Sequence, residues 1–139
     1  MNLTFRDVDF QAVADCELLA RWSNDPEIKY LYHRFTDAER ISFEFTAAYF
    51  QRHRPSPRSE HPQRNLMVLV DDVPIGYGTF EMNSPKLLTS GYKTAWLALM
   101  IGEHPVRRCG LGTRIIAHLE SLCGHVGVER IEIGVFGYN

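Results

Sequence analysis

The chain has 139 residues, of which 45% are hydrophobic and 23% charged, and its formal net charge is −2. These values are ordinary for a globular protein of this size, so we expect a single domain spanning residues 1–139. The slightly acidic balance argues against a dedicated nucleic-acid-binding protein, which usually carries a basic excess. No apolar run approaches the length of a membrane span, so we expect no membrane partner.

The three cysteines, Cys16, Cys109 and Cys123, have spacings that match no zinc or redox motif. We interpret them as reduced thiols, which indicates a cytoplasmic protein. His118 and Cys123 are five residues apart and do not share a helix face well, so we expect no metal site. The N-terminal residues have neither a basic segment nor a long apolar run, unlike a signal peptide.

The first half of the chain predicts one short strand and two helices. Alternating apolar residues from Leu3 to Val8 indicate the strand. Asp9 is the predicted cap of a helix that runs to about Ser23, where Asn-Asp-Pro follows. Thr36-Asp-Ala-Glu39 has the capping-box pattern and predicts the start of a second helix, which should end at residues 52–54.

The segment from residue 51 to 64 contains three prolines and no large apolar side chain, so it predicts a loop. A solvated loop and a basic loop that touches an anionic ligand are both open interpretations. Beyond it, apolar runs predict three antiparallel strands, then an amphipathic helix, then a last strand. Their predicted ranges are 66–70, 75–82, 95–101, 114–123 and 131–135.

The informative stretch runs from Trp96 to Thr113, where the third strand leads through a short loop into the amphipathic helix. The loop contains Arg107-x-x-Gly110-x-Gly112. Glycine allows a ligand to approach the backbone closely, and the first amides of a helix have no intrahelical partner. With the helix dipole, these features predict an anion site suited to a pyrophosphate. The spacing fits neither a dinucleotide-binding nor a Walker A motif.

This stretch resembles the coenzyme A motif of the GNAT N-acetyltransferases, Gln/Arg-x-x-Gly-x-Gly/Ala. The order of predicted elements is similar to that family over nearly the whole chain. Arg21-Trp-Ser-Asn-Asp-Pro-Glu27 and the ending Val135-Phe-Gly-Tyr-Asn139 resemble the branch with ribosomal-protein and aminoglycoside acetyltransferases. The resemblance implies an α+β fold with a mixed central sheet and helices on both of its faces, shortened at the C-terminus.

The resemblance also implies an acetyl-coenzyme A-dependent N-acetyltransferase whose acceptor is a small-molecule or peptide amine. The loop backbone would bind the pyrophosphate, with the two arginines also able to meet phosphates directly. Backbone groups of the preceding strand would bind the pantetheine arm. The residues implied in coenzyme A binding are Met100, Ile101, Arg107, Arg108, Cys109, Gly110, Leu111, Gly112, Thr113 and Asn139.

The resemblance is incomplete at the catalytic base. An acidic residue often stands in the family's motif strand where this chain has Trp96. Glu81 on the preceding strand and Glu103 after the motif strand are the candidate replacements, and His104 is a third. A catalytically weak or silent acyl-coenzyme A-binding module, or a regulatory domain, is therefore the alternative function.

The second departure concerns the C-terminus. The family continues beyond the position of Asn139 with a helix and two strands that supply a tyrosine acid, and Tyr138 is not at that tyrosine's position. Without that segment, the last strand has an open apolar edge, which predicts self-association into a homo-oligomer.

Overall fold

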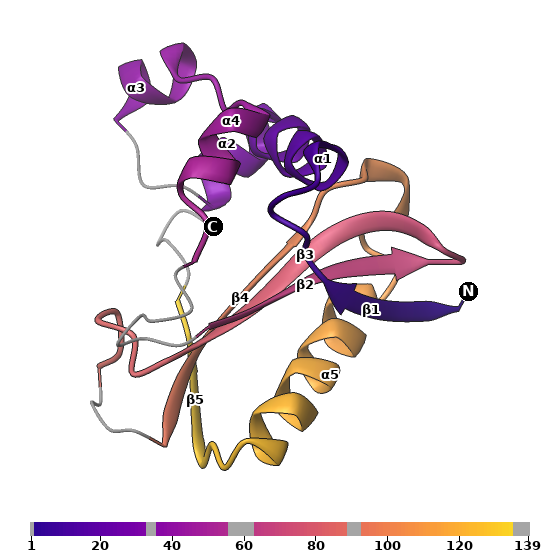
Figure 1. Cartoon of the computed structure of the whole chain (residues 1–139), viewed down its shortest axis with the longest axis vertical. Coiled ribbons are helices and arrows are strands. Elements are labelled where there is room, and N and C mark those ends of the chain that lie inside the picture. Colours follow the sequence, from indigo (N-terminus) through magenta and orange to yellow (C-terminus); the bar gives the residue numbers. More distant parts are fainter. Residues whose placement is uncertain (1, 33–35, 56–62, 89–92, 135–139) are drawn as a thin grey trace. The chain divides into compact units, whose positions relative to one another are not determined.

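The structure of the chain is a computed structural model that describes residues 2–32, 36–55, 63–88 and 93–134 (Figure 1). The chain forms two compact units. Met1–Asp7 and Pro55–Gly134 belong to the first unit, which contains a sheet, and Val8–Arg54 belongs to the second, which is helical. Each unit is described by itself below.

In the first unit, the described residues form a five-stranded sheet in the order β1-β2-β3-β4-β5 (Figure 1). The three neighbouring pairs from β1 to β4 are antiparallel, and β4 pairs with β5 in parallel. The mixed sheet and the predicted meander are thereby confirmed. The strands are β1 (Leu3–Asp7), β2 (Gln63–Val70), β3 (Val73–Met82), β4 (Thr94–Ile101) and β5 (Arg130–Ile133).

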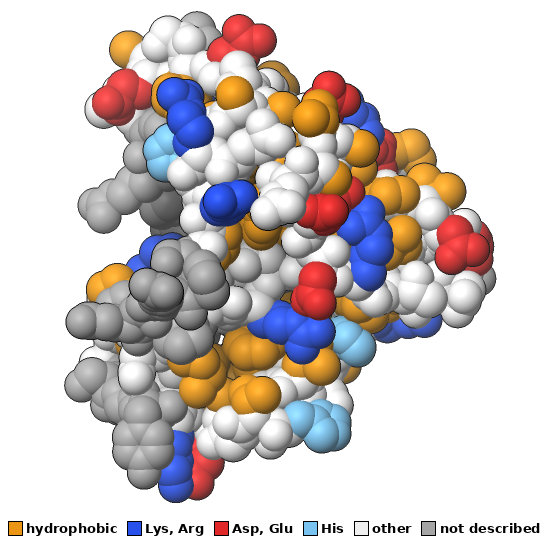
Figure 2. Space-filling view, viewed as in Figure 1, with side chains coloured by type: hydrophobic (Ala, Val, Ile, Leu, Met, Phe, Trp, Pro, Cys, Tyr) orange, Lys and Arg blue, Asp and Glu red, His pale blue; other side chains and the backbone are white. Residues whose placement is uncertain are grey.

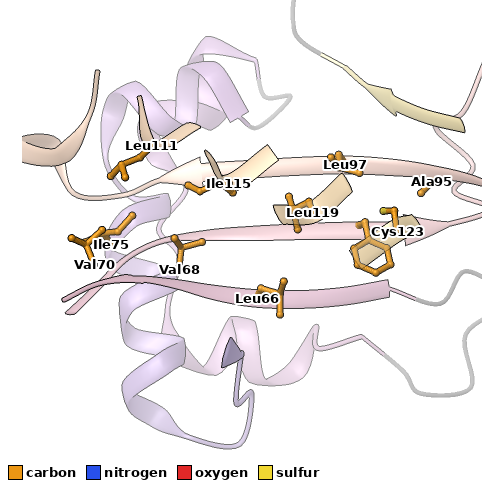
Figure 3. Packing of buried hydrophobic residues seen from close by; sticks show 11 residues of the cluster. Leu66, Val68, Val70, Ile75, Ala95, Leu97, Leu111, Ile115, Leu119 and Cys123 are labelled. Carbon is orange, nitrogen blue, oxygen red and sulfur yellow. The ribbon is translucent and has the colours of Figure 1, made fainter. Parts of the chain in front are cut away.

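One helix, α5 (Leu111–His125), makes the crossover between the parallel strands β4 and β5 and packs on one face of the sheet. Its buried residues recur at helical spacing, as the sequence predicts. They are Leu111, Ile115, Leu119 and Cys123, and Figure 3 shows them over the strand side chains of β2, β3 and β4. Because α5 begins at Leu111, it is one turn longer at its start than the predicted range.

The two glycines of β3 differ in how much space a side chain would have. A Cβ on Gly78 would meet the side chains of Leu119 and Ile115 at 3.4–3.6 Å, which is an ordinary van der Waals distance, so the packing of α5 on the sheet does not require a glycine there. A Cβ on Gly76 would lie 2.3 Å from the Met100 carbonyl oxygen, which the backbone of β4 could not accommodate. Gly76 therefore allows β3 and β4 to approach each other where β4 ends.

The second unit contains four helices among its described residues, and two predictions for it are wrong. Helix α1 begins four residues after Asp9, with Ala12 as its N-cap, because the Asp9 amide donates to the Asp15 carboxylate at 2.9 Å in a preceding turn. The predicted second helix is broken into two. The helices are α1 (Val13–Ser23), α2 (Pro26–Tyr32), α3 (Asp37–Ser42) and α4 (Ala47–Arg52).

The break between α3 and α4 is held by side chains distant in sequence. The Asn24 amide accepts from the Phe45 N–H at 2.7 Å and donates to the Phe45 carbonyl at 2.9 Å. The Lys29 ammonium donates to the Phe43 carbonyl. These side chains pair with backbone groups of Phe43 and Phe45 that would otherwise pair within a helix. Residues 43–46 are therefore extended and separate α3 from α4. The predicted capping box at Thr36 and Glu39 is confirmed at the start of α3.

Within the described ranges, no helix is long and apolar enough to cross a membrane. Figure 2 shows one face of the molecule, on which acidic and basic side chains are interspersed over the coloured residues. The described part of that face therefore has no continuous basic patch of the kind that follows a nucleic-acid backbone.

Candidate active site

The strand–loop–helix stretch has the geometry of an anion site at the start of α5. Gly110 is the N-cap with φ 79° and ψ 4°, a left-handed conformation that favours glycine, and no side chain caps the helix. A Cβ on Gly110 or Gly112 would have no atom within 4 Å, so the space in front of the first helical turn is open. The amides of Leu111, Gly112 and Thr113 are the donors that an α-helix leaves without intrahelical partners.

The end of β4 offers a second set of backbone groups. The Thr94 carbonyl accepts from the Asn83 N–H at 3.3 Å, and the Gly102 N–H donates to the Ile75 carbonyl at 2.8 Å, both toward the β3 side. Because backbone groups alternate in direction along a strand, the even-numbered residues between them face β3. Leu99 and Ile101 therefore direct their backbone groups to the opposite edge.

That opposite edge is the one next to β5, and the described pairing between β4 and β5 ends at Leu97 and Ile133. The described part of β5 thus covers this edge of β4 only as far as this pair. We call the stretch of the edge from Leu97 to Ile101 the fork, and the pair of Leu97 and Ile133 its closed end. Met100, one of the two predicted pantetheine-binding residues, faces β3 through its backbone, where Tyr77 is its register partner. Ile101 lies on the edge next to β5, and so does Leu99.

The side chain of Arg107 binds the end of the strand. Its Nε donates to the Ile101 carbonyl at 2.8 Å, and an Nη donates to the Gly102 carbonyl at 3.3 Å. The other Nη lies 3.3 Å from His104 Nδ1. Arg107 therefore connects the loop to β4, whereas Arg108 and Cys109 are exposed beside it. The remaining predicted coenzyme A residue, Asn139, lies outside the described residues.

The sheet face opposite α5 carries a row of polar and aromatic residues in register. Glu81 on β3 pairs with Trp96 on β4, and Trp96 pairs with Glu132 on β5. The Glu132 side chain is 10% exposed. Its carboxylate accepts from the Leu88 N–H at 2.8 Å and from Arg130 Nε at 3.3 Å. Trp96, at the position where the resemblance leads us to expect an acidic residue, thus stands between two carboxylates on adjacent strands.

The two predicted catalytic carboxylates lie at opposite ends of β4. Glu81 is level with Trp96, close to the closed end of the fork. Glu103 follows the strand, at the N-cap of the short turn His104–Val106, and its N–H donates to the Ile75 carbonyl at 3.2 Å. His104 is exposed in the same turn. Glu103 and His104 therefore lie beside the loop that precedes α5, and Glu81 does not.

A helix start with an open glycine backbone, beside a strand edge with which no described strand pairs, is the arrangement that the resemblance to coenzyme A-binding acyltransferases implies. The sequence matches the Acetyltransferase (GNAT) family over residues 22–139. The chain belongs to this family of N-acetyltransferases, and the mixed sheet with its helices is the fold of that family.

Solved structures share the fold. The aminoglycoside acetyltransferase AAC(6')-Ib in complex with coenzyme A is 18% identical with a TM-score of 0.77, and the alignment covers 99% of this chain and 77% of that one. Its complex with coenzyme A and kanamycin has 19% identity, a TM-score of 0.75 and the same coverage. A domain from Methanocaldococcus jannaschii has 14% identity and a TM-score of 0.68, covering 99% and 80%. No curated protein sequence matches the chain significantly.

Sequence reasoning missed two features of the site. Strand alternation places Glu132 between Ile131 and Ile133 and so on the face away from α5, but its register with Trp96 depends on pairing that the sequence does not show. The bond from Arg107 to Ile101 joins residues six apart across a turn, and an arginine in a phosphate-binding motif predicts phosphate contact instead.

Proposed function

We propose that this chain transfers an acetyl group from acetyl-coenzyme A to a primary amine by direct attack in a ternary complex. The observation that supports the proposal is that the backbone at the start of α5 and the backbone at the end of β4 lie next to each other along the chain. The open first turn of α5, at Gly110 and Gly112, is preceded in the chain by the edge of β4 at Leu99 and Ile101, with which no strand pairs among the described residues. One surface suits a pyrophosphate, and the other suits an extended amide-containing arm.

Different backbone and side-chain groups would bind different parts of coenzyme A. The amides of residues 111–113 donate to the pyrophosphate, and the positive end of the helix dipole favours its charge. Arg108, which is exposed in the loop, adds a charge-assisted contact to a phosphate. Leu99 and Ile101 bind the pantetheine arm in the manner of a strand, so the arm runs from the loop toward the closed end of the fork at Leu97.

Acyl transfer from acetyl-coenzyme A to an amine forms a C–N bond and breaks the C–S bond, with the thiol as the second product. The Leu99 N–H is the backbone donor on the edge next to β5 near the closed end, so we assign it to the thioester oxygen, where negative charge develops. The proton lost by the amine passes to a carboxylate, directly or through a water. We assign this role to Glu81 rather than Glu103, because Glu81 is level with the closed end of the fork.

The acceptor is proposed as a small-molecule or peptide amine. A solved relative in fold binds kanamycin, an aminoglycoside, together with coenzyme A, which supports a small polar amine. Because Trp96 stands where the resemblance leads us to expect an acidic residue, a weak or silent acyl-coenzyme A-binding module stays the second candidate. A single domain over residues 1–139, a cytoplasmic location and self-association remain predictions from the sequence.

The test combines binding and turnover. Calorimetry with acetyl-coenzyme A measures binding, and release of free thiol in the presence of aminoglycosides, sugar amines and short peptides measures transfer. The proposed function predicts both binding and amine-dependent thiol release, with release reduced in Glu81→Gln and retained in Glu103→Gln. Binding without release by any amine supports the silent module instead, and absence of binding contradicts both.

A further inference from the structure

The indole of Trp96 crosses from β4 to β5. A Cβ built on Gly134 would lie 2.3 Å and 2.6 Å from two carbons of the six-membered ring of Trp96, Cη2 and Cζ2. The far end of the indole therefore occupies the place that a side chain at position 134 would take. Trp96 and Gly134 form a complementary pair, in which the missing side chain on one strand accommodates the large one on the other.

This pair lies at the closed end of the fork. Trp96 is adjacent to Leu97 and Gly134 is adjacent to Ile133, and Leu97 with Ile133 is the last described pair of β4 and β5. The register places Trp96 on the sheet face opposite α5, together with Glu81 and Glu132. The indole therefore covers the closed end of the fork on that face.

On the face of the sheet that α5 covers, the position next to Trp96 is filled by apolar side chains. Leu97 is 1% exposed and belongs to the apolar cluster beneath α5, which also contains Phe80, Leu119 and Cys123. Backbone pairing between Leu97 and Ile133 blocks a straight path along the strands. Among the described residues of the sheet, the direction left for an acyl chain that is too long for the closed end is the face that the indole of Trp96 covers.

We propose that Trp96, seated on Gly134, is the residue that limits the length of the acyl group, so that acetyl is accepted and longer straight chains are excluded. This inference rests on the proposed function, because it places the acyl end of the pantetheine arm at the closed end of the fork. An indole has only two side-chain torsions, so a ring seated over Gly134 has few other positions to adopt and forms a wall on this face.

The test compares the affinities of coenzyme A, acetyl-coenzyme A and butyryl-coenzyme A by calorimetry. The wild-type protein is expected to bind acetyl-coenzyme A more tightly than butyryl-coenzyme A. Trp96→Ala is expected to shift the ratio of the two affinities toward butyryl-coenzyme A by roughly tenfold, because two buried methylenes become accommodated. Coenzyme A without an acyl group is the reference ligand that reports the integrity of the remaining site.

A second variant displaces the ring without removing it. Gly134→Ala forces the end of the indole to move, and it is expected to change the same ratio in the same direction, by less. Trp96→Phe keeps an aromatic ring on β4 that is too short to reach Gly134, so an intermediate ratio is expected. These variants keep the inference testable if Trp96→Ala does not fold.

The outcomes separate this inference from the function on which it rests. If the wild-type protein binds none of the three ligands, the proposed function and the inference both fail. If it binds them and both the Trp96 variants and Gly134→Ala leave the ratio unchanged, the function stands and the inference is overturned. Equal affinity of the wild-type protein for acetyl- and butyryl-coenzyme A overturns it as well.

Discussion

The guanidinium of Arg107 donates from Nε to the Ile101 carbonyl at 2.8 Å, which ties the loop before α5 to the last residue of β4. This bond joins the two backbone surfaces that the proposed coenzyme A site needs. It also shows that the first residue of the loop motif acts on the protein backbone, and the exposed Arg108 is the arginine left for phosphate contact.

We expect Arg107→Ala to lower the free energy of unfolding by about 1–2 kcal/mol, because two backbone carbonyls lose a charged donor. Acetyl-coenzyme A affinity should fall with it, since the loop and strand edge are no longer aligned. Chemical denaturation and calorimetry measure the two effects. Arg107→Gln can still donate to one carbonyl and should recover part of both.

The matched control for stability is Arg108→Gly. Arg108 is exposed and has φ 60°, a conformation that glycine adopts without strain, so this variant should be at least as stable as the wild-type protein. If Arg107→Ala is as stable as the wild-type protein and binds acetyl-coenzyme A equally well, the connecting role of Arg107 is wrong.

Thiol labelling provides a probe of the loop. Cys109 is exposed, whereas Cys16 and Cys123 are buried. Burial raises the pKa of the Cys123 thiol to about 11 and also raises the pKa of Cys16, so neither is a ready thiolate at neutral pH. We expect one thiol per chain to react rapidly with an alkylating reagent, and saturating coenzyme A should slow that reaction.

Cys109→Ser is the control for this assignment, because it should remove the rapid phase and leave a folded protein. Mass spectrometry of the labelled peptide identifies the site. A labelling rate of Cys109 that does not change when coenzyme A saturates the protein is inconsistent with a ligand bound across the loop.

The ring of His118 stacks on Phe5 with centroids 3.7 Å apart and an interplanar angle of 6°. Burial, and then the positive charge of Arg64, lower the pKa of His118 from its ordinary value of 6.5. The folded protein therefore holds a neutral ring that the unfolded chain protonates more readily. Its contribution to stability is complete above pH 6.5 and is lost as the pH falls below that value.

Denaturation of the wild-type protein and of His118→Phe at pH 8 and pH 5.5 measures this effect. The variant keeps an aromatic ring against Phe5 and cannot be protonated, so its stability should decrease less between the two pH values. Equal decreases in the two proteins would show that His118 does not titrate differently on folding.

The sequence predicted features that depend on local patterns. The capping box at Thr36 and Glu39 is one example, since both of its bonds lie within four residues. The meander and the glycine loop are others, because strand alternation and turn residues mark them. The family resemblance then joined these elements into the correct fold.

Features that depend on distant residues could not be predicted from one sequence. The extended segment from Phe43 to Thr46 is held by Asn24 and Lys29, which bind its backbone. Its one local signal is Thr46, which caps α4 by accepting from the Tyr49 N–H at 3.1 Å, and the prediction of one unbroken helix did not use it. Likewise, the pairing of Trp96 with Glu132 and the fit of its ring over Gly134 follow from the register of β4 and β5. Register is set by the packing of the whole sheet.

The most direct test of the coenzyme A site uses two glycines at opposite ends of α5. Gly112 lies in the first turn and Gly124 in the last, and a Cβ on either would have no atom within 4 Å. Leucine is a better helix former than glycine, so Gly112→Leu and Gly124→Leu should each be about 0.5–1 kcal/mol more stable than the wild-type protein.

The decisive measurement is the calorimetric affinity of these two variants for acetyl-coenzyme A. At Gly112, the leucine side chain fills the space before the helix amides, so binding should be lost although the protein is more stable. At Gly124, the same side chain lies at the far end of the helix, and binding should match that of the wild-type protein. Wild-type affinity in Gly112→Leu would contradict the assignment of the start of α5 to the pyrophosphate.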